Sequence, residues 1–85
     1  MQICKVVGNI WATKKEDSLR GVKLMVVQPK GGGENDEFVA ADLAGAGIGE
    51  QVLVVTGSTA RAAFAHKPVY IDAAIVGIID GAEHK

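Results

Sequence analysis

The stretch Ala40–Arg61, AADLAGAGIGEQVLVVTGSTAR, decides the fold of this chain. A short apolar run, Phe38–Leu43, holds one acid near its end, Asp42, as a strand often does. Three glycines, Gly45, Gly47 and Gly49, then alternate with Ala46 and Ile48 before Glu50. The next run, Gln51–Thr56, is β-branched and apolar, which is typical of a buried strand. We therefore predict two strands joined by a tight glycine turn.

The end of this stretch predicts a short helix. Gly57 stops the second strand, and the hydroxyl of Ser58 is placed to accept a hydrogen bond from a free amide of the first helical turn. Ala60, Arg61, Ala62 and Ala63 favour a helix, and Lys67-Pro68 ends it. The prediction is a helix over Ser58–Ala65 with Ser58 as its N-cap.

Three more strands are predicted on either side of this stretch. The first covers Gln2–Thr13, with a bulge or bend at Gly8, and the second covers Val22–Gln28, ended by Pro29. The segment Lys30–Glu37, KGGGENDE, has no apolar residue and reads as a hairpin tip. The last strand covers Val69–Asp80, with Gly77 at a bend.

Five strands and one short helix in 85 residues predict a mainly β fold, a small OB-like antiparallel β-barrel, closed or partly open. The first, fourth and last strands are apolar on both faces, as in Val69–Asp80. A small barrel with one helix covers only one face of such strands. Because monomers seldom expose large apolar patches, we expect another copy of the chain to bury the second face.

Several classes of function fit this sequence poorly. The glycines lead straight into a strand, whereas a dinucleotide fingerprint or a phosphate loop leads into a helix. His66 and His84 lack a cysteine or acid at metal-ligand spacing, so no metal site and no cofactor are expected. The acids Asp42, Glu50, Asp72 and Asp80 are read as turn formers or ion-pair partners before catalytic groups. A small enzyme or ligand-binding barrel that uses Asp42 or Glu50 stays open as an alternative.

Composition also bears on location and partners. The chain has one cysteine, Cys4, which excludes an intramolecular disulfide and is expected to be a buried thiol. No apolar run approaches the about 20 residues of a membrane span, and no signal peptide is recognised, so we expect a soluble cytoplasmic protein that binds no membrane.

A single-stranded nucleic-acid-binding module is the alternative that an OB-like outline raises. Such a module needs a basic groove and aromatic residues on which bases stack. The formal net charge here is -1, and the aromatic residues are few: Trp11, Phe38, Phe64 and Tyr70. We therefore expect no nucleic-acid partner, although the fold alone leaves this alternative open.

Taken in order, several motifs resemble one family over almost the full length. They are the first strand with Gly8 and Thr13, Leu19-x-Gly21-x-Lys23-Leu24, Val39-Ala40-Ala41-Asp42, Gly45-Ala46-Gly47-x-Gly49-Glu50-x-Val52-Leu53-Val54, Gly57-Ser58-x-Ala60-Arg61 and Asp72–Asp80. Together they resemble the bacterial microcompartment vertex proteins of the EutN/CcmL type. The glycine-rich Lys30–Glu37 tip and the pair Tyr70-Ile71 depart from that pattern.

The resemblance implies a single vertex domain over residues 1–85, with a five-stranded barrel that assembles as a cyclic homopentamer. Such a pentamer occupies the five-fold vertices of a bacterial microcompartment and closes a shell built with hexameric shell proteins. The implied role is structural, and no enzyme activity is expected. The implied contacts with a neighbouring subunit or tile are made by Gly45, Ala46, Gly47, Gly49, Glu50, Ser58 and Arg61.

Overall fold

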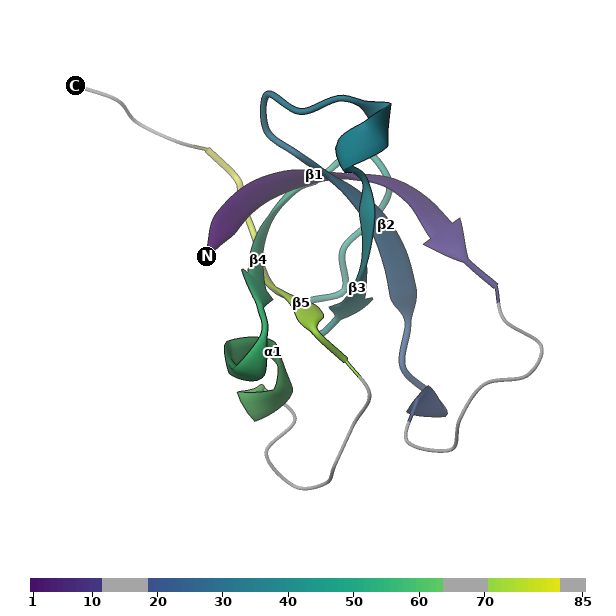
Figure 1. Ribbon diagram of the computed structural model, residues 1–85. Helices are drawn as coiled ribbons and strands as arrows, with labels where there is room; N and C mark the ends of the chain where they lie inside the picture. Colours follow the sequence, from purple (N-terminus) through teal and green to yellow (C-terminus); the bar gives the residue numbers. More distant parts are fainter. Residues whose placement is uncertain (12–18, 64–70, 82–85) are drawn as a thin grey trace.

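The strands close into a barrel in the order β1-β2-β3-β5-β4, as a computed structural model shows (Figure 1). The structure describes residues 1–11, 19–63 and 71–81. The strands are β1 (Gln2–Ile10), β2 (Leu24–Pro29), β3 (Phe38–Asp42), β4 (Gln51–Thr56) and β5 (Ala73–Ile78). The helices are α1 (Ser58–Ala62) and the 3-10 helix η2 (Glu34–Asp36). The predicted mainly β barrel with one short α-helix is confirmed.

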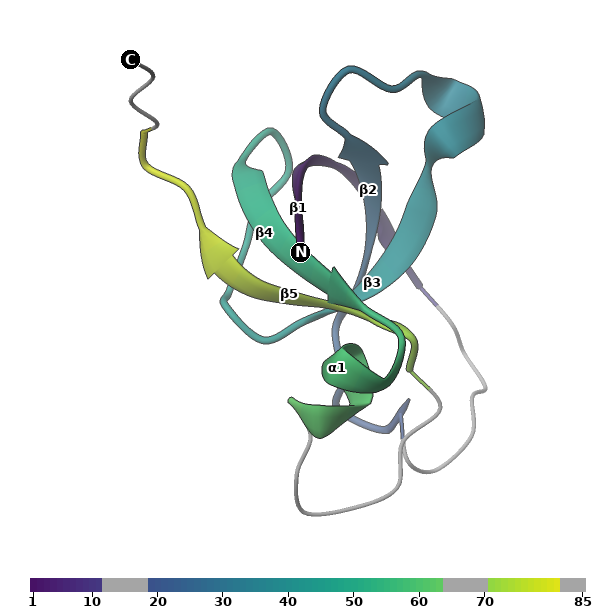
Figure 2. The same cartoon turned by 60° about the vertical axis from the view of Figure 1, so that its left-hand side comes forward.

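Alternation along the strands builds the core. Val6, Met25, Val27, Val52, Val54 and Ile75 are completely buried inside the barrel. Each such side chain contributes about 1.5–3 kcal/mol when it leaves water. Helix α1 lies outside the barrel, where Ala60 packs against Val55 of β4 and Ala74 of β5 (Figure 2).

Two glycines mark irregularities where the sequence predicted bends. The register between β1 and β2 shifts between Val6 and Gly8, and the register between β4 and β5 shifts beside Gly77, which pairs with Leu53. The predicted hairpin tip Lys30–Glu37 joins β2 to β3, which are antiparallel, and it carries η2.

The strands do not all run antiparallel, which corrects one part of the prediction. β3 and β5 are parallel and pair only through Ala41↔Ala74 and Asp42↔Ile75. β5 is last in sequence but enters the barrel between β3 and β4. The apolar periodicity of a strand indicates which of its faces is buried, but it does not indicate which other strand pairs with it or in which direction.

The ends of the elements also differ from the prediction. β1 ends at Ile10 and β5 begins at Ala73, so both strands are shorter than predicted. The predicted residues Ala12, Thr13, Phe64, Ala65, Val69 and Tyr70 lie outside the described part of the chain.

The predicted N-cap at Ser58 is wrong. Gly57 is the N-cap of α1, with φ 68°, and no side chain caps the helix. The carbonyl of Gly57 accepts hydrogen bonds from the amides of Ala60 and Arg61. The N-cap therefore lies one residue earlier than predicted, at a glycine that adopts this positive φ without strain, whereas the helix begins at Ser58 as predicted.

Candidate assembly site

The segment Leu43–Glu50, here called the glycine loop, crosses one end of the barrel from β3 to β4. The side chain of Ala46, in the middle of this loop, is 1% exposed and packs in the main hydrophobic core. Gly45 and Gly49 have φ of 78° and 93°, which a side chain would strain. The loop therefore closes the end of the barrel with its backbone and with two methyl groups, that of Ala46 inside the core and that of Ala44, which is partly buried against it. The sequence predicted a tight turn between neighbouring strands, yet β3 and β4 are not paired.

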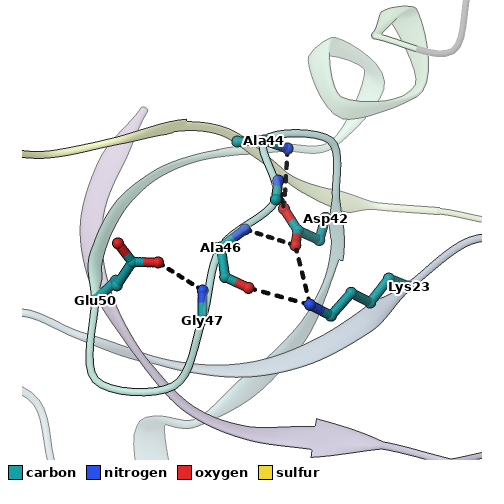
Figure 3. Close-up of polar contacts among 7 residues, drawn as sticks. Lys23, Asp42, Ala44, Ala46, Gly47 and Glu50 are labelled. Atoms are coloured by element: carbon teal, nitrogen blue, oxygen red, sulfur yellow. Dashed lines mark hydrogen bonds and ion pairs between the residues drawn. The ribbon is translucent and has the colours of Figure 1, made fainter.

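Asp42 holds the first half of the glycine loop (Figure 3). Its Oδ1 accepts hydrogen bonds from the amides of Ala44 at 2.9 Å and Gly45 at 3.0 Å. Its Oδ2 accepts one from the amide of Ala46 at 2.8 Å. This side chain is 1% exposed, so its charge must be satisfied locally. Asp42 is a turn former, as the sequence analysis expected.

Lys23 adds a second link to the same loop. Its Nζ donates to the carbonyl of Ala46 at 3.2 Å and lies 3.9 Å from Oδ2 of Asp42. The sequence places Lys23 in the motif Leu19-x-Gly21-x-Lys23-Leu24 and predicts no role for its side chain. Its position nineteen residues before Asp42 becomes meaningful only after β2 and β3 pair.

Glu50 and β1 hold the second half of the glycine loop. The Oε1 of Glu50 accepts from the amide of Gly47 at 2.7 Å, and the amide of Gly49 donates to the carbonyl of Val6 at 2.8 Å. A Cβ at Gly47 would lie 3.4 Å from Oε1 of Glu50. Two carboxylates, one at each end, thus fix the backbone of a loop in which three of the eight residues are glycines.

Two large apolar side chains project from the two ends of the glycine loop. Leu43 is 46% exposed and lies beside β5, since its amide donates to the carbonyl of Ile75 at 3.1 Å. Ile48 is 62% exposed and precedes Gly49, which bonds to β1. Apolar side chains therefore face the solvent near both ends of the glycine loop.

The two predicted residues on the helix lie apart from the glycine loop. Ser58 and Arg61 are exposed on α1, which Figures 1 and 2 place away from the loop. In the described part of the chain, Arg61 pairs with neither Glu50 nor Asp42. The structure thus brings Gly45, Ala46, Gly47, Gly49 and Glu50 together and leaves Ser58 and Arg61 at a separate place.

The remaining reactive groups form no obvious chemical site among the residues described. No three His, Cys, Asp or Glu side chains gather there as a metal site would require. Burial raises the pKa of the Cys4 thiol, which keeps it protonated and unreactive. The described helices include none that is long and apolar enough to cross a membrane. His66 and His84 lie outside the described residues.

The comparisons with known proteins agree with this architecture. The family model described as "Ethanolamine utilisation protein EutN/carboxysome" matches residues 1–80, and the chain belongs to this EutN/CcmL family. The carboxysome shell vertex protein CcmL of Thermosynechococcus vestitus is 48% identical over 85 residues, which cover 94% of this chain and 84% of that protein.

Two solved structures show the same fold. The GrpN pentameric microcompartment shell protein from Rhodospirillum rubrum is 41% identical, with a TM-score of 0.83, and the alignment covers 100% of this chain and 99% of that one. CcmL of Gloeobacter violaceus is 38% identical, with a TM-score of 0.87, over 99% of this chain and 90% of that one.

Proposed function

We propose that this protein is a structural shell protein, a homopentamer that caps the five-fold vertices of a bacterial microcompartment in the cytoplasm. The main support for this proposal is that the whole barrel matches the structure of GrpN, a pentameric microcompartment shell protein. In this role the protein performs no chemical step. It closes a polyhedral shell together with hexameric shell proteins.

The geometry of closed shells explains why such a part is needed. Hexagonal tiles alone make flat sheets, and five-fold positions supply the curvature that closes them. A ring of five copies has head-to-tail contacts, so each copy needs two different contact surfaces. The exposed apolar side chains of this chain are spread over β1, β3, β5 and the glycine loop, which supports a protein that is covered on more than one side.

The glycine loop suits a contact with a neighbouring subunit or tile. Gly45, Gly47, Gly49 and Glu50 expose backbone that a neighbour can approach closely, and Ala46 fixes the shape of the loop from inside the core. Because Asp42 and Glu50 already order the loop, binding loses little conformational entropy there. Ser58 and Arg61 would form a second contact region, in which Arg61 pairs with an acid across the boundary.

The surface of the described residues does not favour the nucleic-acid alternative. Trp11 is the one exposed aromatic side chain among the described large hydrophobics. One aromatic residue does not make the stacking platform that single strands require.

Two measurements test the proposal. Native mass spectrometry of the purified protein should give a discrete five-chain species that an oligonucleotide titration leaves unchanged. Co-expression with a hexameric shell protein should give closed particles under the electron microscope, whereas the hexamer alone should give sheets or open assemblies. A monomer, or binding to the oligonucleotide that weakens as salt rises, would contradict the proposal.

A further inference from the structure

A hollow of about 310 Å³ lies on the outer face of the barrel, between β1 and the turn that follows β2. Lys5 of β1 pairs with Gln28 of β2 and with Gln51 of β4, and all three residues line the hollow. Because paired residues of neighbouring strands point to the same face of a sheet, their side chains form one row. Cys4 and Val6, on either side of Lys5 in the sequence, are buried, so this row faces away from the core.

The turn that follows β2 forms one wall of the hollow, and hydrogen bonds hold it against β1. The amide of Lys30 donates to the carbonyl of Ile3 in β1 at 3.0 Å, and the amide of Gly32 donates to the carbonyl of Pro29 at 2.8 Å. Nε2 of Gln28 donates to the carbonyl of Gly32 at 2.7 Å. Figure 1 shows this connection from β2 to β3 next to β1. The wall is therefore ordered before any ligand binds, which lowers the entropy cost of binding.

The hollow gathers positive charge. Lys5 and Lys30 both line it, whereas none of its described lining residues is Asp or Glu. In the described part of the chain, the ammonium groups of these two lysines have no ion-pair or hydrogen-bond partner. The carboxylate of Asp36, which lies near Gly32, already accepts a hydrogen bond from the amide of Gly33 at 3.0 Å. Two cations of this kind around one hollow attract an anion.

The other groups that line the hollow indicate what kind of anion fits. A phosphate monoester carries a charge of about −1.5 to −2 at pH 7 and offers three acceptor oxygens, which match two ammonium groups and the amide of Gln51. Ile3 and Val7 also line the hollow and are partly buried, so they offer an apolar floor for carbon atoms. Sites for small molecules span about 300–1,000 Å³, so this hollow fits only a small ligand.

We propose that this hollow binds a small organic phosphate. The ammonium groups of Lys5 and Lys30 hold the phosphate group, and the carbon atoms of the ligand rest on Ile3 and Val7. This site goes beyond the proposed structural function, because it gives a shell protein a place for a charged small molecule. The resemblance to the EutN/CcmL family assigns it no role, since its wall belongs to the glycine-rich tip in which the sequence departs from the family motifs.

The probe is glycerol 3-phosphate, which is titrated into the full-length protein labelled with ¹⁵N. The amide resonances of Gly31 and Gly32, which line the hollow, should shift and saturate, whereas glycerol alone should leave them unchanged. Added salt should weaken the binding, since the two lysines are exposed.

Lys5→Gln and Lys30→Gln should each weaken the binding about fivefold, the effect of losing one exposed charge pair. The matched control is Gly81→Glu, which lowers the net charge by the same one unit at an exposed position with open space around its Cβ. This control should bind glycerol 3-phosphate as tightly as the unaltered protein.

Three outcomes would overturn the inference and leave the proposed function standing. They are the absence of a saturable shift at Gly31 and Gly32, an equal loss of binding in Gly81→Glu, and equal affinity for succinate, a dicarboxylate without phosphate. If a lysine variant fails to fold by circular dichroism, the titrations of the unaltered protein with glycerol 3-phosphate, glycerol and succinate still decide the question.

Discussion

Asp42 and Ala46 fix one another at the end of the barrel. The amide of Ala46 donates to Oδ2 of Asp42 at 2.8 Å, and the methyl group of Ala46 is 1% exposed within the core. At Ala46 the glycine loop is thus held by a polar contact of its backbone and by an apolar contact of its side chain. This arrangement gives the first prediction.

Asp42→Ala should destabilise the protein by about 2–3 kcal/mol, because it leaves the partly buried amides of Ala44 and Ala46 without acceptors. For a domain of this size, 1 kcal/mol lowers the melting temperature by roughly 4–8 °C. Thermal unfolding followed by circular dichroism at one fixed protein concentration measures the effect, since the stability of an oligomer depends on concentration. Asp80→Ala, at an exposed site after β5, is the control, and an equal loss in both variants would contradict the role of Asp42.

Gly47→Leu should prevent assembly and leave the fold nearly intact. The φ of Gly47 is not positive, and a Cβ there would meet only Oε1 of Glu50, which can move. A bulky side chain would still keep a neighbour away from the exposed backbone of the loop. Native mass spectrometry and circular dichroism together measure this. The matched control Gly33→Leu lies at an N-cap with φ -114° and with open space around its Cβ position, and it should assemble normally.

Ser58→Ala should change the free energy of unfolding by less than about 0.5 kcal/mol, as expected for an exposed surface site. If the Ser58 hydroxyl capped the helix, its loss would cost about 0.5–2 kcal/mol. Urea unfolding distinguishes the two values. Ile75→Val, at a completely buried core position, is the positive control. It should lower the free energy of unfolding by about 0.5–1.5 kcal/mol and so test whether the assay resolves a loss of this size.

Cys4 should make stability fall at alkaline pH. Burial raises the pKa of its thiol above the ordinary value of 9.0, so above about pH 9 the unfolded chain has lost this proton while the folded chain keeps it. The unfolded state then binds fewer protons, and the free energy of unfolding falls by up to about 1.4 kcal/mol per pH unit until the folded pKa is passed. Comparison with Cys4→Ala at each pH isolates this effect, because every other group titrates in both proteins. A difference between the two that stays constant from pH 7 to 11 would refute it.

The sequence predicts much of this fold because its strands are rich in apolar and β-branched residues and its turns carry glycine. Gln51–Thr56 is predicted to the residue, and the irregularities beside Gly8 and Gly77 fall where those glycines suggest. The N-cap was misassigned because a serine before helix-forming residues is a common cap, and the positive φ of Gly57 is visible only in the structure.

The candidate site was harder to predict because it depends on contacts between distant segments. The motif Gly45–Glu50 identifies the loop, but the link from Lys23 to Ala46 needs β2 and β3 to be paired first. The exposure of Trp11 could not be read from an apolar run, since the same run also fills the core with Cys4 and Val6.

The position of β5 in the barrel has a consequence for how shells grow. β5 comes last in the sequence, yet it pairs with β3 on one side and with β4 on the other. A chain shortened before Ala73 therefore leaves one edge of β3 and one edge of β4 unpaired. Because unpaired strand edges pair readily with other chains, we expect shortened chains to aggregate before they reach a shell.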